Sequence, residues 1–372
     1  MDGSYWQRKS WLAIGILTLA AGLPSCATVM PRQADIPPLE GHELPVVPDA
    51  DLLHLSPEMH EFVEQFTATE SGRHSKAWSL SYAALDPYVL AFSYDPQLTL
   101  TAEEAFRQRR GNCLTFSAMF VAMARDAGLE AHFQEVIIPP KWSAVNDTVL
   151  VSKHVNAVVS DRFRDYTIDV SRRETSPRDM RQPLSDREAR AQYFNNQGAD
   201  ALVRGDLPLA YANFVKALEI QPRLAYVWSN LGVVLRRNDQ TNEAIHAYRT
   251  ALQYDPDHAV ALNNLHTIYT EEGDFEAAAV LARRVEKYRR NNPYYLLHLA
   301  ETANEEQRWS DAIELLNQAI RIDDTEYRFH YALAQAQFNA GLVEVAQASL
   351  DRARALAPGD LPESSLPLPD GP

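Results

Sequence analysis

Three side chains in the N-terminal half have the types needed for nucleophilic catalysis. Cys113 follows Gly111 and Asn112 and begins the almost wholly apolar stretch CLTFSAMFVAMARDAG. The positive end of a helix dipole favours the thiolate of a cysteine placed there, and the thiolate is the nucleophilic form. His154 and Asp169 follow in two stretches rich in β-branched residues. Together, such groups can attack a carbonyl carbon, protonate its leaving group and orient the imidazole.

Each of these residues also has a purely structural interpretation. A lone cysteine on an apolar helix is more often a small core residue. His132 is a second imidazole, but it lies on an apolar strand directly after the helix, which is typical of a packed histidine. Asp161 and Asp165 are weaker candidates for the acid, because both fall at a predicted turn, where solvated acids are common.

Local patterns predict the elements that position the three side chains. Thr101 and Glu104 form a capping box, which begins a helix just before the cysteine segment. The last two predicted strands are joined by SDRFR, and we expect them to form a hairpin that places His154 beside Asp169. The predicted helices span 58–68, 101–110 and 113–128, and the predicted strands span 131–138, 153–160 and 165–170.

A family resemblance rests on three of these stretches. RRGNCLTFSAMFVAMARDAGLEAHFQEV, HVNAVV and YTIDV together resemble the core of the transglutaminase-like cysteine enzymes. The resemblance covers 101–170 well and 58–100 loosely. It implies an α+β papain-like domain, which we place at 58–178.

The same residues define the expected reaction. Cys113 would attack the carbonyl carbon of an amide, and His154 would protonate the departing amine while Asp169 orients its ring. The resulting thioester would be resolved by water or by an amine. The backbone N–H of Cys113 is an expected oxyanion donor, and a second donor is sought among Asn112, Gln134 and Trp142.

The C-terminal half carries an internal repeat. Five alanines are spaced 34 residues apart: Ala210, Ala244, Ala278, Ala312 and Ala346. The small, aromatic and proline positions around them resemble the tetratricopeptide repeat, in which each unit is two antiparallel helices. We therefore predict an all-α solenoid over 191–358. Its five copies are expected at 191–222, 225–256, 259–292, 293–324 and 327–358.

Stacked helix pairs usually form a concave groove for an extended peptide or a partner helix. Positions that face the groove in the repeat pattern are Asn195, Ser229, Asn263, Leu297 and Tyr331, with Arg236 and Phe338 nearby. A protein or peptide partner is expected there, and the alternative is an ordinary solvated surface. Residues 359–372 are rich in proline and aspartate and are predicted to be a loose tail.

The N-terminus has the pattern of a secretory signal. Arg8 and Lys9 precede an uncharged run of 15 residues, short of the roughly 20 that span a bilayer. The sequence Leu-Pro-Ser-Cys that ends at Cys26 resembles the lipobox of bacterial lipoproteins, which implies cleavage of 1–25 and acylation of the cysteine. The alternatives are an ordinary signal peptide with a chance cysteine and an uncleaved anchor.

Residues 26–57 are rich in proline and predict an extended tether, or a strap packed on the first domain in its second half. Ala27 does not match the aspartate that retains such lipoproteins at the inner membrane. The resemblance therefore implies a bacterial cell-envelope protein, lipid-anchored at the outer membrane and facing the periplasm.

Composition excludes several functions. A formal charge of −15 and an acidic pI argue against nucleic-acid binding. Two cysteines exclude a disulfide framework and a cysteine-built zinc site, and the eleven histidines have no ligand spacing. The chain also lacks P-loop, GxGxxG, HExxH and GxSxG motifs. No metal and no cofactor are expected.

These observations favour a membrane-anchored cysteine peptidase or amidase of the cell envelope, with the repeats recruiting a protein substrate or partner. Two alternatives stay open. One is a non-catalytic scaffold or assembly factor that keeps the triad only as a peptide-binding cleft. The other is an acyl-transferring transglutaminase, which would require a site that excludes water.

Overall fold

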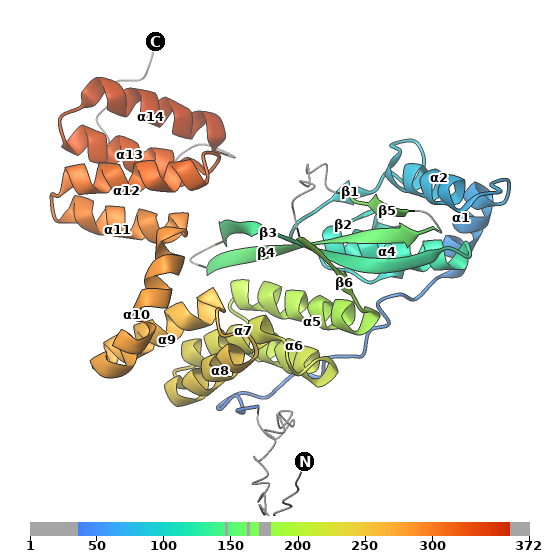
Figure 1. The fold of residues 1–372 in the computed structure, drawn as a ribbon, viewed down its shortest axis with the longest axis horizontal. Helices are drawn as coiled ribbons and strands as arrows, with labels where there is room; N and C mark the ends of the chain where they lie inside the picture. The colour runs from blue at the N-terminus through green and yellow to red at the C-terminus, as the bar shows by residue number, and fades with distance from the viewer. Residues whose placement is uncertain (1–35, 146–147, 162–163, 171–179, 358–372) are drawn as a thin grey trace, which may run out of the picture.

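The computed structural model describes residues 36–145, 148–161, 164–170 and 180–357. It consists of a mixed α/β part followed by a stack of helices, and α5 of the stack lies next to β3 of the sheet (Figure 1). This agrees with the predicted fold class. The predicted signal segment 1–25, Cys26 and the tail 359–372 lie outside the described residues. Within them, no helix is both long enough and apolar enough to cross a membrane.

The α/β part contains a four-stranded antiparallel sheet in the order β5-β4-β3-β6, and a short parallel pair, β1-β2. Its elements are α1 (Pro57–Thr67), α2 (Arg73–Leu85), β1 (Ser93–Tyr94), α3 (Ala102–Gln108), β2 (Arg110–Gly111), α4 (Cys113–Asp126), β3 (Glu130–Val145), β4 (Thr148–Ser160), β5 (Asp165–Ile168) and β6 (Met180–Leu184).

The helix α4 forms the centre of this part. Every residue from Leu114 to Ala124 is buried, because a helix that is apolar on all sides must be surrounded by other elements. Its neighbours in the core come from α1, α2, α3 and the strands β3 and β4. The predicted capping box begins α3, with Thr101 as its N-cap and Glu104 bonded back to the Thr101 backbone.

The sheet is larger than the sequence predicted. Both β3 and β4 extend beyond the predicted stretches, with a register irregularity between Val136 and Lys141. The strand β6 pairs with β3 and therefore belongs to this part, so the predicted boundary at 178 ends too early. Its sequence, MRQPL, has a proline and no alternation of apolar residues, so it gives little strand signal.

The C-terminal part is a solenoid of five helix pairs, formed by the described helices α5 to α14. Four of the five alanines at the 34-residue spacing are fully buried where paired helices cross, and Ala278 is nearly so. Gly232 allows the same close approach, since a Cβ there would lie 2.6 Å from the Tyr248 ring. The helices are α5 (Asp186–Val203), α6 (Leu207–Ile220), α7 (Ala225–Arg237), α8 (Thr241–Tyr254), α9 (Ala259–Glu271), α10 (Phe275–Arg290), α11 (Pro293–Glu305), α12 (Trp309–Ile322), α13 (Tyr327–Asn339) and α14 (Val343–Leu356).

The apolar core of the solenoid is divided between α10 and α11. One cluster of buried side chains runs through α5 to α10, and separate clusters lie among α11 to α14. Figure 1 shows α10 leading from the first stack to the second. The sequence signal for this division is the departure of the third repeat, RRVEKYRRNNP, from the pattern.

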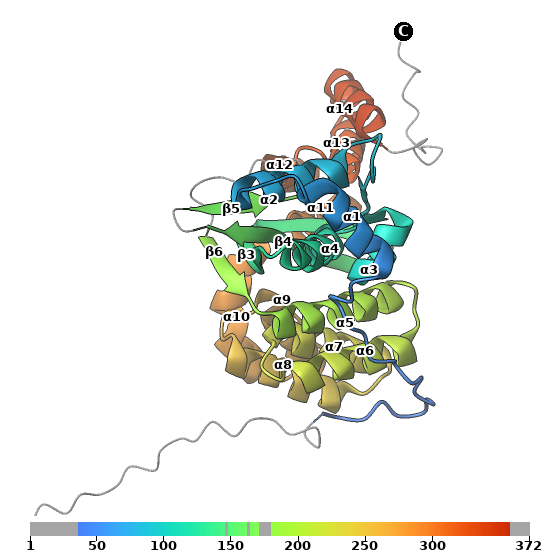
Figure 2. The ribbon, with the colours of Figure 1, turned by 90° about the vertical axis from the view of Figure 1, so that its right-hand side faces the viewer.

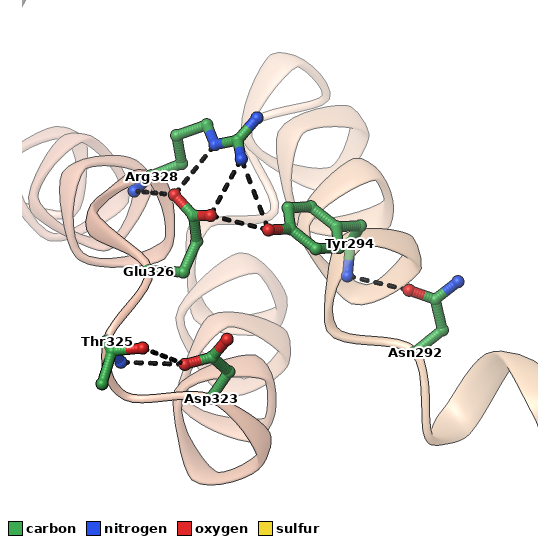
Figure 3. A network of polar contacts seen from close by, with 6 residues as sticks. All are labelled: Asn292, Tyr294, Asp323, Thr325, Glu326 and Arg328. Atoms are coloured by element: carbon green, nitrogen blue, oxygen red, sulfur yellow. Dashed lines mark hydrogen bonds and ion pairs between the residues drawn. The ribbon is translucent and has the colours of Figure 1, made fainter. Parts of the chain in front are cut away.

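Polar contacts fix the start of the second stack (Figure 3). The Asn292 side chain caps α11 by accepting from the Tyr294 N–H, and Pro293 occupies the first helical position. The Tyr294 hydroxyl donates to Glu326 at 2.6 Å, and Arg328 donates to both oxygens of the same carboxylate. These bonds join α11 to the start of α13 and so hold two successive repeats together.

The proline-rich segment at the start of the described residues lies against the repeats. We call residues 36–50 the strap. Leu39 is buried among repeat side chains, the Glu40 N–H donates to Gln240, and Arg190 binds the strap near its end. Figures 1 and 2 show this blue segment beside the first repeats before it reaches α1. It is extended, as predicted, and it packs on the repeats. The residues that follow it pack on the first domain, as the alternative for the second half of 26–57 expected: Leu52 is buried in the core around α4, and its carbonyl oxygen accepts from the Ala102 N–H.

Candidate active site

Cys113 is the first residue of α4, and the residue before it, Asn112, is the N-cap of that helix. The Asn112 side chain accepts a hydrogen bond of 3.0 Å from the Thr115 N–H, which is the N-cap interaction. A Cβ at Gly111 would lie 2.3 Å from the Thr115 side chain, so a glycine is needed there. The thiol is partly exposed. It therefore lies at the positive end of a buried helix.

His154 and Asp169 come from adjacent strands. The β4–β5 pairing ends at Ala157 and Ile168, so Asp169 follows directly beside Asn156. His154 and Asn156 are alternate residues of β4 and face the same side of the sheet. The His154 Nε2 atom lies 2.5 Å from the Asp169 Oδ2 atom, and the two side chains are 4% and 16% exposed. The predicted hairpin thus brings the imidazole to the carboxylate.

The imidazole also contacts the thiol. A hydrogen bond with Cys113 is among the causes that shift the pKa of His154, so the two side chains lie next to each other. Burial lowers the pKa of His154, but the hydrogen bonds to Asp169 and Cys113 outweigh it and raise the pKa to about 9. The ring is therefore an imidazolium at neutral pH, as an ion pair with a thiolate requires.

The three candidates for a second oxyanion donor lie in different places. The Asn112 side chain accepts the N-cap bond through its oxygen and donates one N–H of its amide to Thr99, which leaves a single N–H of that amide for a substrate. Asn112 therefore stays a candidate for the second oxyanion donor. Gln134 lies on β3 opposite Asn156, and its buried Oε1 has no hydrogen-bond partner. Trp142 pairs in register with Val151, beyond the irregularity in β3.

The alternative residues lie away from this arrangement. Asp165 pairs with Ser160, at the opposite end of the β4–β5 ladder from Asp169, and Asp161 belongs to the adjoining turn. His132 is half-buried on β3 opposite Val158, four residues from the partner of His154.

Asn156 is a polar residue of this site that sequence reasoning missed. It is 1% exposed, and neither atom of its amide has a hydrogen-bond partner. A buried amide without partners is costly, and such groups often occur at functional sites. The signal was present in HVNAVV, where asparagine takes an inward position of an otherwise apolar strand.

The predicted groove residues differ in burial and in hydrogen bonding. Asn195 accepts a hydrogen bond from Asn230, Asn263 accepts one from Arg289, and Arg236 donates to Thr241. Ser229 is fully buried, so its assignment to a groove was wrong. The cause is helical phase, because one step around a helix turns a side chain by about 100°.

The remaining groove positions, Leu297, Tyr331 and Phe338, are partly buried and pack against the cores of the second stack. Among the described residues there is no group of histidine, cysteine and acidic side chains that could hold a metal ion.

Family models match both parts of the chain. The model of the transglutaminase-like superfamily matches residues 60–165. Models of the tetratricopeptide repeat match residues 213–246, 235–301 and 303–365. The chain therefore has a transglutaminase-like domain followed by tetratricopeptide repeats, a class of repeat that generally serves protein–protein interaction.

Individual relatives match only part of the chain. This chain is 34% identical over 92 residues to the uncharacterized protein ycf37 of Pyropia yezoensis. The matched stretch covers 25% of this chain and 52% of that protein. It is 28% identical over 109 residues to the photosystem I assembly protein Ycf3 of Cyanophora paradoxa, covering 27% and 63%. The chain thus spans about half to three-fifths of the length of these relatives.

Solved structures resemble the chain weakly. PilF of Pseudomonas aeruginosa has 20% identity and a TM-score of 0.36, over 47% of this chain and 79% of that one. A MamA fragment from Desulfovibrio magneticus has 15% identity and a TM-score of 0.30, over 46% and 96%.

Proposed function

We propose that the transglutaminase-like domain is a cysteine peptidase or amidase whose triad is Cys113, His154 and Asp169. The observation that carries the proposal is the position of His154, which hydrogen-bonds both the carboxylate and the thiol. A buried imidazole with these two partners is the arrangement that nucleophilic catalysis by cysteine requires.

The reaction follows from the protonation states. The thiolate of Cys113 attacks the amide carbon, and the negative charge on the carbonyl oxygen faces the Cys113 N–H at the positive end of α4. His154 gives its proton to the nitrogen as the carbon–nitrogen bond breaks, which leaves a thioester and a neutral amine. The neutral ring then accepts a proton from water as the water oxygen attacks the thioester carbon. The carbon–sulfur bond breaks, the acyl group leaves as a carboxylic acid, and the imidazolium of His154 and the thiolate of Cys113 are restored.

The repeats would bring a protein substrate or partner to this domain, and a lipid on Cys26 would hold the protein at the envelope. Support for the partner comes from the repeat class, and support for the lipid comes from the lipobox-like sequence. Acylation would give a much firmer membrane attachment than a single short apolar segment on a surface.

The enzymatic proposal is tested by trapping the acyl-enzyme. The purified chain is mixed with a p-nitrophenyl ester of an acylated amino acid, and nitrophenolate release is followed by stopped flow. We expect a burst of about one equivalent per chain, because a thioester forms faster than it hydrolyses. Mass spectrometry should place the acyl group on Cys113. With Cys113→Ala as the control, a burst of equal size, or no burst in the wild type, would favour the scaffold alternative.

The membrane proposal is tested by changing Cys26. In a bacterial host, Cys26→Ala should move the protein from the membrane to the soluble fraction, or leave the precursor uncleaved. The measurement is fractionation with immunoblotting, together with the intact mass of the mature chain. A variant that still loses residues 1–25 and still sediments with membranes contradicts the lipoprotein interpretation.

A further inference from the structure

The first repeat helix, α5, contacts the segment that precedes the nucleophile. Gln197 Nε2 donates a hydrogen bond of 2.9 Å to the backbone carbonyl oxygen of Thr99. On the same helix, Asn195 accepts a bond of 2.9 Å from Asn230 of α7. One helix therefore belongs to the repeat array and also contacts the transglutaminase-like domain close to Cys113.

The segment 98–100 supports the start of α4. Thr99 is 3% exposed, and its hydroxyl oxygen accepts a bond of 2.6 Å from Asn112 Nδ2. The next residue, Leu100, donates its N–H to the Thr115 hydroxyl at 2.8 Å. Both contacted residues belong to the first turn of α4 or cap it. A shift of this segment would therefore move the beginning of the helix.

Asn112 connects this support to the reactive atoms. It is joined to Cys113 by a peptide bond, and its side chain caps the turn that carries the thiol. The Cys113 N–H and the thiol thus take their positions from the Asn112 cap. Small displacements at such a point have large effects, since a shift of about 1 Å in a reacting group can cost about a hundredfold in rate.

We propose that Gln197, a residue of the repeat array, is a positioning residue for Cys113. By holding Thr99, it keeps Asn112 and the start of α4 where the thiol meets His154. The inference rests on the proposed function, because it concerns the same nucleophile. It also means that the transglutaminase-like domain depends on the first repeat helix for full reactivity.

The test replaces Gln197 by leucine, which keeps the size of the side chain and removes the donor. The second-order rate of Cys113 alkylation by iodoacetamide is measured from pH 5 to pH 9 on the full chain. We expect the rate at pH 6 to fall about tenfold, within the range for a displaced reacting group. We also expect the pH of half-maximal rate to rise, because the thiol loses part of its contact with His154. Gln197→Asn, which keeps the amide but shortens its reach, should change the profile in the same direction.

Gln192→Leu is the matched control. Gln192 lies on the same helix and donates to the buried Glu135 of β3, so its loss weakens the junction of the two parts without touching the segment 98–100. Its melting temperature should fall at least as far as that of Gln197→Leu, while its alkylation profile stays close to that of the wild type.

The outcomes separate the two proposals. A wild-type thiol that is inert at every pH overturns both the proposed function and this inference. A reactive wild-type thiol with an unchanged profile in both Gln197 variants overturns the inference alone. Equal changes in Gln192→Leu and Gln197→Leu also overturn it, because general loosening of the junction would then explain the effect.

Discussion

Replacement of His154 by alanine should slow the alkylation of Cys113 at pH 6 by about a hundredfold. An unassisted thiol has an ordinary pKa of about 8.5, so only about 0.3% of it is thiolate at pH 6. In the native protein, the pKa of His154 is raised to about 9, so a positive ring lies beside the thiol, and a neighbouring positive charge makes a thiol more reactive. The measurement is the iodoacetamide rate at pH 6, followed by mass spectrometry of the peptide that contains Cys113.

His132→Ala is the control for this experiment. His132 lies on the neighbouring strand and is half-buried, so its loss should lower stability more than it changes thiol reactivity. The wild-type thiol should react almost as fast at pH 6 as at pH 8. Equal rates in the wild type and in His154→Ala would mean that the imidazole does not activate Cys113, and the proposed mechanism would then be wrong.

Asp169→Asn should lower the hydrolysis of an amide by about ten-thousandfold, as loss of the orienting carboxylate does in other nucleophilic triads. An asparagine of the same shape still reaches His154 Nε2, but it no longer stabilises the positive ring. The proton that the leaving amine needs is then missing. The measurement compares kcat/KM for a p-nitrophenyl ester and for the anilide of the same acyl group.

The two substrates separate the roles of the site. Nitrophenolate leaves without a proton, so the ester should lose much less than the anilide in Asp169→Asn. In the wild type, anilide hydrolysis should fall as pH rises through about 9, because His154 loses the proton that it donates. Ester acylation should not fall there, because the thiolate remains. Equal losses on both substrates would show that Asp169 acts on the nucleophile rather than on proton transfer.

Elements with local signals were predictable from the sequence. The capping box of α3, the apolar helix α4 and the 34-residue spacing of the alanines each depend on residues close in the chain or on a strict period. The proximity of His154 and Asp169 could be predicted for the same reason, because a short turn joins the two strands that carry them.

Features that depend on distant partners were not predictable. The strand β6 forms because its backbone pairs with β3, and the sequence MRQPL carries no signal for that pairing. The support that Asn112 receives from Thr99 is a second example, because it depends on a segment that lies before another helix in the chain. The composition of the strap indicated an extended chain, although not the surface on which it lies.

The strap also fixes an order of assembly. Glu40 binds Gln240, which is 200 residues further along the chain, so the contact cannot form until α7 and the turn after it have been synthesised. Closing a loop of that length costs on the order of 5 kcal/mol in chain entropy, and the helix pairs, whose contacts are local, need not wait for it. We therefore expect the strap, although it is made first, to complete its docking only after the first helix pairs have formed. A nascent chain that stops before Gln240 could form the bond from Tyr211 to Pro37 but not the bond from the Glu40 N–H to Gln240, so the strap would be held only in part.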